Sequence, residues 1–303
     1  MRFQNDNIKG GVVMIAAVGA LSLMDAGMKV LSGVYSPLQV AAIRALASLP
    51  LIVLWIGLTG GFAQLRRVHV ALHLLRGVLG IAMLAAFIFG VRHVPLAEAY
   101  TIFFIAPLLI TAFSVPLLGE RVEPRRWLAI GGGLLGVLIV LRPSGTGLIT
   151  LGGVAVMGSA AAYALSAITV RILGRTDSTQ SMVFWLMSIV GAGAGLLALP
   201  RWRAIQPEHW IVIAAIGVAG FFGQWAITEA FRIGEPSFIA SFEYTALAWG
   251  LGLDWVLFRT VPGMRTFAGA AVIIACGAYL IQRERRAVKA PTGHAPTGDL
   301  VDG

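Results

Sequence analysis

The sequence predicts an all-α membrane protein with ten transmembrane helices in two inverted five-helix repeats. Composition is the first reason: 58% of the 303 residues are hydrophobic and 12% are charged, whereas soluble domains carry about 25% charged residues. The second reason is that apolar runs cover nearly the whole chain, which excludes a soluble protein and a soluble enzyme with one membrane anchor. The third is a weak internal similarity at an offset of about 142 residues.

Each predicted span is an apolar run of roughly 20 residues, the length that crosses a bilayer core of about 30 Å. Pro, Gly or charged residues bound the runs, and the connections leave no room for a separate soluble domain. The first run contains Asp25 and Lys29 and lacks a persuasive cleavage site, so we interpret it as an uncleaved helix and not as a signal peptide. The approximate cores are 10–31, 37–58, 70–91, 95–118, 125–141, 152–173, 179–199, 209–231, 236–258 and 264–282.

The distribution of basic residues predicts the orientation. If the N-terminus is cytoplasmic and the chain crosses ten times, fourteen of the 23 Lys and Arg residues fall on the cytoplasmic side and six outside. The net charge of +9 is then a topology signal and does not indicate nucleic-acid binding. Both termini are predicted to be cytoplasmic, and residues 287–303, rich in Pro, Gly and Thr, are predicted to form a disordered cytoplasmic tail.

An internal repeat divides the chain at its middle. Residues 10–12 (GGV) align with residues 152–154 (GGV), and Lys29 aligns with the basic Arg171 at the same end of its span. The halves, residues 8–142 and 150–283, each hold five spans. Because five is odd, the second half enters the membrane from the opposite side, and inverted repeats are how many secondary transporters obtain two conformations that face opposite sides.

Ionisable residues at membrane depth are the first candidates for a functional site, because a charge at the bilayer centre costs about 2.5 to 3.5 kcal/mol on insertion scales. In one continuous helix, Glu243 and Asp254 would share a face. Structural alternatives remain open for several: an Asp25–Lys29 ion pair, a lipid-phosphate anchor for Arg76 and a helix-start cap for Glu98. The eight candidates are Asp25, Lys29, Arg44, Arg76, Glu98, Glu229, Glu243 and Asp254.

Aromatic residues inside the spans extend this set. A buried hydroxyl or indole N–H needs a partner, so these side chains either line a pocket for an organic solute or pack against neighbouring helices. Five other tryptophans lie nearer the span ends, where interfacial aromatic residues are expected. The candidates within spans are Tyr100, Tyr163, Trp225, Tyr244 and Trp249.

Motifs for catalysis, metals and cofactors are missing from the sequence. His69 and His73 have zinc-like spacing, but no third ligand is evident, and Cys276 is the single cysteine. No Walker, GxSxG or dinucleotide sequence occurs, so we predict no catalytic residue, no metal and no cofactor. The predicted partners are a small-molecule solute and the lipid bilayer, without nucleic acid; small-xxx-small pairs such as Gly132 and Gly136 do not settle whether a homodimer forms.

Residues 95–122 (PLAEAYTIFFIAPLLITAFSVPLLGERV), followed by a glycine-rich span, resemble the EamA module of the drug/metabolite transporter superfamily, as do MDAGMKVL at 24–31, Arg44 and FEYTALAW at 242–249. The resemblance covers about residues 8–283. It implies ten helices in two inverted repeats, a central cavity built largely from spans 1 to 4 and 6 to 9, and cytoplasmic termini. The family's Gly-Glu is kept at Gly119-Glu120, but span 9 ends in Arg259-Thr260, so a symmetric role for that acid is in doubt.

The sequence therefore favours a secondary transporter that moves a small organic metabolite across the cytoplasmic (inner) membrane by alternating access. An amino acid, an S-adenosylmethionine-like cofactor and a riboflavin-like vitamin all remain open as solutes. If protons drive the cycle, Glu243 is the first choice for the proton site, since desolvation favours the protonated form of a carboxyl group. The alternatives are an uncoupled facilitator and a membrane-embedded lipid-handling protein or enzyme.

Overall fold

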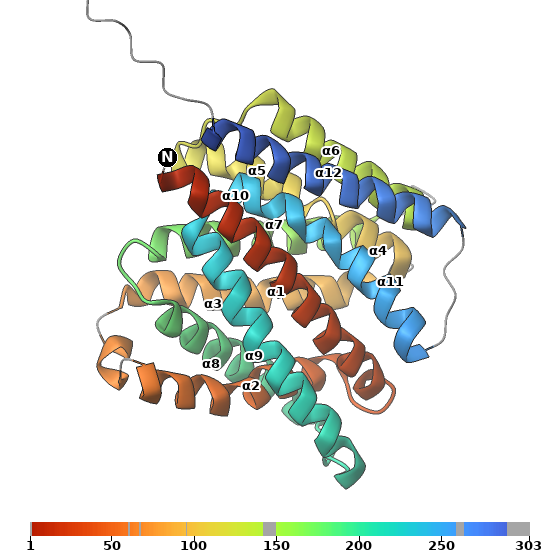
Figure 1. Cartoon of the computed structure of the whole chain (residues 1–303). Coiled ribbons are helices and arrows are strands. Elements are labelled where there is room, and N and C mark those ends of the chain that lie inside the picture. The colour runs from red at the N-terminus through yellow and green to blue at the C-terminus, as the bar shows by residue number, and fades with distance from the viewer. Residues whose placement is uncertain are drawn as a thin grey trace, which may run out of the picture.

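The computed structural model is a bundle of helices that run roughly along one axis (Figure 1). It describes residues 2–59, 61–66, 68–94, 96–141, 150–258 and 264–289, and within these ranges every regular element is a helix. The all-α fold class is therefore confirmed. The last helix continues to Lys289, so the first three residues of the predicted tail at 287–303 are helical, and the rest of the tail lies outside the described residues.

The helix bounds follow the predicted spans closely, because most begin or end at Pro, Gly or a polar capping residue. Ser178 Oγ accepts a hydrogen bond from the Ser181 N–H at the start of one helix, and Gly119 ends another with a left-handed φ of 70°. The α-helices are α1 (Arg2–Ser32), α2 (Pro37–Thr59), α3 (Val70–Val91), α4 (Leu96–Phe103), α5 (Ala106–Leu118), α6 (Pro124–Leu141), α7 (Leu151–Leu173), α8 (Thr179–Ala198), α9 (Trp210–Ile233), α10 (Pro236–Ile239), α11 (Thr245–Phe258) and α12 (Met264–Lys289). Short 3₁₀ helices are η1 (Phe62–Leu65), η3 (Leu199–Arg201), η4 (Pro207–His209) and η5 (Ala240–Tyr244).

Within the described residues, nine helical segments are long and apolar enough to cross a membrane. They correspond to nine of the ten predicted spans. The remaining span, 236–258, is built from α10, η5 and α11, so the prediction of one continuous helix there is wrong. The face shared by Glu243 and Asp254 is corrected with it, since Glu243 lies in the 3₁₀ segment and the Asp254 side chain lies outside the described residues.

Two spans are interrupted, and they occupy matching places in the two halves. The fourth span breaks between α4 and α5 at Phe104 and Ile105, because Pro107 has no N–H to donate to the carbonyl of Phe103. At an offset of 141 residues this break falls at the junction of η5 and α11. There the hydroxyl of Thr245 donates to the Phe242 carbonyl, 2.6 Å away, which competes with the regular helical pattern.

Helices of the first half pair with helices of the second half, and the pairs come in matched sets. The first span packs against the eighth (α1 with α9) and the third against the sixth (α3 with α7). The second and seventh spans (α2 with α8) pack together, as do the fifth and tenth (α6 with α12), which lie side by side in Figure 1. Exchanging the two halves reproduces this set of contacts.

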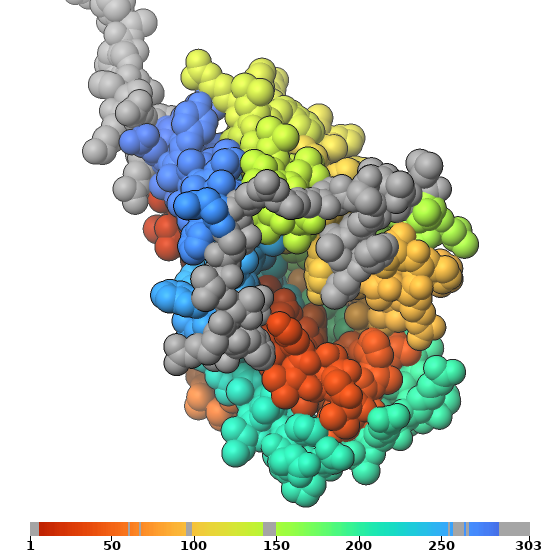
Figure 2. Space-filling view, turned by 90° about the vertical axis from the view of Figure 1, so that its right-hand side faces the viewer, coloured from red at the N-terminus to blue at the C-terminus, as the bar shows by residue number. Residues whose placement is uncertain are grey.

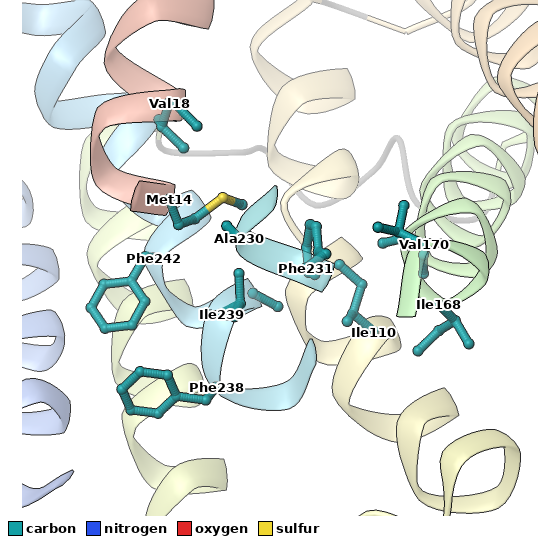
Figure 3. Packing of buried hydrophobic residues seen from close by; sticks show 14 of the residues in the cluster. Met14, Val18, Ile110, Ile168, Val170, Ala230, Phe231, Phe238, Ile239 and Phe242 are labelled. Atoms are coloured by element: carbon teal, nitrogen blue, oxygen red, sulfur yellow. The ribbon is translucent and has the colours of Figure 1, made fainter. Parts of the chain in front are cut away.

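The start of α1 and the end of α12 lie at the same end of the bundle, here called the N-end (Figure 1). The opposite end, at the α1–α2 and α8–α9 connections, is called the distal end. The largest buried apolar cluster joins α1, α5, α7, α9, α10 and η5, and its aromatic members Phe231, Phe238 and Phe242 surround Ile239 (Figure 3). Met14 of α1 completes this contact in the N-terminal half of its helix.

Candidate functional site

Figure 2 looks onto the distal end, where the surface is hollowed between segments of α1, α4 and α11. Three predicted residues meet here from three helices: Asp25 of α1, Arg44 of α2 and Tyr100 of α4. Asp25 interacts electrostatically with both Arg44 and Tyr100. Asp25 and Tyr100 are exposed and Arg44 is half-buried. Because side chains that face lipid from separate helices do not converge, these three line the hollow.

The depths of Asp25 and Arg44 agree with this placement. Asp25 lies seven residues before the distal end of α1, and Arg44 lies seven residues after the distal start of α2. At 1.5 Å per residue, both are about 10 Å below the distal end. The acid and the base thus stand at the same level on facing helices.

A row of aromatic rings leads inward from this level. The ring of Tyr100 lies 5.6 Å from that of Phe87 in α3, Phe87 lies 5.5 Å from Phe103 in α4, and Phe103 lies 5.8 Å from Tyr163 in α7. These separations are typical of interacting aromatic pairs. Phe87, Phe103 and Tyr163 are each half-buried, so the rings keep accessible faces.

The row ends at Glu243. The Tyr163 hydroxyl donates a hydrogen bond of 2.9 Å to Glu243 Oε1, joining the middle of α7 to η5. Glu243 is half-buried, and apart from this hydrogen bond its neighbourhood is apolar, with Tyr244 beside it in the chain. A carboxyl group in such a place changes its protonation state easily when its solvent access changes.

Arg76 of α3 lies deeper, toward the N-end, with 3% of its surface exposed. Its Nη1 donates to the Met182 carbonyl at 3.0 Å, and its Nη2 lies 3.4 Å from Thr228 Oγ1. Nε has no hydrogen-bond partner. The guanidinium also interacts electrostatically with Tyr163, so a buried cation stands next to the Tyr163–Glu243 pair. No ion pair forms between Arg76 and a carboxylate of the described residues.

Glu229 is held by a local ion pair. Its two carboxylate oxygens accept hydrogen bonds from Arg232 at 2.6 and 2.8 Å, and Thr179 donates a third at 2.5 Å. These contacts tie the end of α9 to the start of α8 near the N-end. Glu229 therefore lies away from the hollow, although the sequence groups it with the other membrane-depth acids.

The remaining aromatic candidates are dispersed. Tyr244 is 1% exposed and its ring lies against Gly133 of α6, away from the row. Trp249 is exposed, and its Nε1 donates to the Ile15 carbonyl at 3.1 Å, bridging α11 and α1. Trp225 packs edge-on against Trp55, 6.4 Å away.

Two charged candidates are less informative. Lys29 is exposed one turn beyond Asp25, at the rim of the distal end. The side chain of Glu98 lies outside the described residues. The structure thus brings together Asp25, Arg44 and Tyr100 at the mouth, and Tyr163, Glu243 and Arg76 below them.

A cluster that the sequence left unassigned closes part of the N-end. The Asp177 carboxylate, between α7 and α8, bonds to His73 Nε2 at 2.8 Å, His69 Nδ1 at 3.1 Å and the His69 N–H at 3.1 Å. Burial acts to raise the pKa of Asp177, but the hydrogen bonds from His69, His73 and Thr176 outweigh it and lower that pKa below its usual range. The described residues contain no group of three side chains arranged to hold a metal ion.

A second network joins the N-end across four segments. Arg126 at the start of α6 contacts Glu235 at 2.5 Å and Glu284 of α12 at 3.8 Å. The Asn7 side chain of α1 donates to Glu284 at 2.9 Å and accepts from the Glu235 N–H at 2.9 Å. Together with the apolar cluster in Figure 3, this network closes the N-end, while the distal end is hollowed.

Comparisons with known proteins agree with this architecture. A family model described as the EamA-like transporter family matches residues 8–142 and 150–283. A riboflavin transporter of Vibrio cholerae is 28% identical over 82% of this chain and 83% of its own length. The pseudopaline exporter CntI of Pseudomonas aeruginosa is 29% identical over 89% and 96%. An S-adenosylmethionine uptake transporter of Rickettsia prowazekii is 22% identical over 71% and 73%.

One solved crystal structure has the same fold. It aligns with a TM-score of 0.78 at 20% sequence identity and covers 93% of this chain and 99% of its own. At this identity the likeness concerns the fold alone.

Proposed function

The chain belongs to the EamA-like transporter family, and from this premise we propose that it carries a small organic metabolite across the cytoplasmic membrane by proton-coupled alternating access. As a member of this family it is a membrane transporter and not an enzyme. The relatives named above carry riboflavin, pseudopaline and S-adenosylmethionine. An organic solute of similar size suits a cavity with aromatic walls and few charges.

Alternating access is supported by the matched contacts of the two halves. We propose that residues 8–142 and 150–283 are inverted repeats, because exchanging them reproduces the helix pairs and places the two interrupted spans in equivalent positions. Interrupted spans at corresponding places in two halves are typical of transport sites near the midplane. With both termini cytoplasmic, as the basic residues predict, the N-end faces the cytoplasm and the hollow faces outward.

The Tyr163–Glu243 hydrogen bond is the observation that carries proton coupling. It lies at the inner end of the aromatic row, where a solute that entered from the hollow would stop. A deprotonated Glu243 would be stabilised by the Tyr163 hydroxyl and by the nearby charge of Arg76, and a protonated Glu243 is favoured once water is excluded. Tyr244 is the other ionisable group beside it.

Glu243→Gln tests this proposal. Purified protein in proteoliposomes is first screened with riboflavin, S-adenosylmethionine, pseudopaline and L-tryptophan to find a transported solute. We expect Glu243→Gln to abolish accumulation driven by an imposed pH gradient while counterflow of preloaded solute persists. The exposed carboxylate of Glu208 offers the matched control, and Glu208→Gln leaves both activities intact. Unchanged gradient-driven flux in Glu243→Gln would refute the proton site.

An uncoupled facilitator is the second candidate, since an alternating-access protein needs no ion to equilibrate its solute. It would show counterflow but no accumulation in the wild type under any imposed pH gradient. The two candidates therefore differ in the wild-type protein before any substitution is made.

A further inference from the structure

Asp25 and Arg44 face the distal hollow with opposite charges, and neither is satisfied by the protein. They interact electrostatically across the gap between α1 and α2. In the described contacts, however, the Asp25 carboxylate and the Arg44 guanidinium make no hydrogen bond and no ion pair. The other described acids of the N-end networks, such as Glu229 and Asp177, are fully engaged. Asp25 and Arg44 are thus a separated pair within reach of solvent.

A separated pair of this kind fits a solute that carries both charges. A carboxylate and a guanidinium that served only stability would close into direct contact, because charge-assisted hydrogen bonds strengthen as water is excluded. Here the two groups are held apart on different helices at the same depth. A solute with an ammonium group and a carboxylate in close succession fills the gap with two charge-assisted contacts, one to each side chain. A singly charged solute satisfies only one of them.

The surroundings add a ring to this description. The aromatic row begins at Tyr100, which lies beside Asp25, and continues inward through Phe87 and Phe103 with accessible ring faces. A planar group attached to the charged end of a solute would lie against this row. Lys29 adds positive charge at the rim, one turn beyond Asp25, on the path of an entering carboxylate.

We propose that the distal half of the cavity is a binding subsite for a zwitterionic solute that bears a planar ring. Asp25 binds its ammonium group, Arg44 binds its carboxylate, and Tyr100, Phe87 and Phe103 contact its ring. The proposal rests on the transport function proposed above and narrows the class of solute from that function.

Ring-matched probes test the charge requirement on the unmodified protein. Binding to full-length protein in lipid nanodiscs is measured for L-tryptophan, tryptamine and indole-3-propionate, and for L-phenylalanine, phenethylamine and 3-phenylpropionate. We expect each zwitterion to bind at least about tenfold more tightly than either of its singly charged analogues, the effect of one charge-assisted hydrogen bond. Riboflavin, which has a ring system but neither charge, should bind more weakly than both zwitterions. Equal or tighter binding of a singly charged analogue or of riboflavin overturns the proposal, as does a lack of binding by both zwitterions.

Two variants assign the two contacts. Asp25→Asn should remove the preference of L-tryptophan over indole-3-propionate and keep its preference over tryptamine. Arg44→Gln should do the reverse. This crossed pattern is not produced by partial unfolding, which weakens all probes alike. If both variants weaken all probes equally, the assignment of the two contacts is wrong.

Failure of this inference is distinguishable from failure of the transport proposal. If the zwitterion preference is absent but gradient-driven flux still depends on Glu243, the coupled transporter stands and the subsite falls. If the preference holds while Glu243→Gln changes nothing, the subsite stands and proton coupling at Glu243 falls.

Discussion

Arg76 is a buried cation whose described contacts are too weak to explain its presence by stability. Its partners are one carbonyl and one hydroxyl, and Nε has none. Replacing a buried charge by an apolar side chain of similar volume is often neutral or stabilising by about 1 to 4 kcal/mol. We therefore expect Arg76→Met to unfold at the same temperature as the wild type or higher, while solute transport falls at least about tenfold. Thermal unfolding and proteoliposome flux measure the two effects, and a destabilised but active variant would contradict this expectation.

Asp177 is predicted to make the opposite contribution. Its folded-state pKa is lowered, so its stabilising contacts are fully present above the unfolded pKa of about 4 and are lost as pH falls through the lower folded value. Asp177→Asn should cost about 2 kcal/mol at neutral pH through the weakened bonds to His69 and His73. It should also remove part of the acid-induced loss of stability. Unfolding temperatures between pH 3 and 7 test both expectations, with Glu208→Gln as the exposed control.

Single residues of the candidate site could be selected from the sequence, but their partners could not. A charge inside an apolar run is visible in one dimension, which is how Asp25, Arg44 and Glu243 were selected. The bond between Tyr163 and Glu243 joins positions 80 residues apart, and only the packing of α7 against the interrupted ninth span creates it. In the same way, Asp177 lies in a polar connection and gives no signal until His69 and His73 are brought to it.

At the scale of elements, the close approach of α6 to its neighbours depends on glycine. A Cβ atom at Gly133 would lie 2.4 Å from the Tyr244 ring, whereas one at Gly131 meets nothing within 4 Å. We expect Gly133→Ala to destabilise the protein by about 1 to 3 kcal/mol, the usual result of overpacking. Gly131→Ala, two positions earlier in the same helix, should be neutral or stabilising by up to about 1 kcal/mol. Equal unfolding temperatures for the two variants would show that η5 yields to α6 without cost.

The elements themselves were largely predictable because length and apolarity determine a membrane span. The small-xxx-small spacing of Gly132 and Gly136 also matched a real close approach, since a Cβ at Gly136 would lie 2.9 Å from the Gly269 carbonyl of α12. The interruption of the ninth span was not predictable. Residues 237–258 contain no proline, and the hydroxyl bonds to backbone carbonyls that accompany the break are ordinary inside continuous helices as well.

At the scale of the whole molecule, the two ends differ. The N-end is joined by Arg126, Glu235, Glu284 and Asn7 and by the apolar cluster around Met14, whereas the distal end is hollowed. We infer that this is the outward-facing state of the transport cycle and that the Arg126 network must open before solute reaches the cytoplasm. The network couples the ends of the first, fifth, ninth and tenth spans, which belong to both halves.

Arg126→Gln should therefore shift the population toward the inward-facing state by about tenfold, a typical coupling energy for a conformational switch. Two reporters in a Cys276→Ala background follow the shift with a membrane-impermeant thiol reagent. Met14→Cys lies in the N-end cluster and should become more reactive from the cytoplasmic side, while Tyr100→Cys at the hollow becomes less reactive from outside. Arg175→Gln, which removes an exposed charge at the same end, should move neither reporter. Opposite changes mark a change of state, because unfolding would make both reporters more reactive; a rise at both sites would contradict the gate.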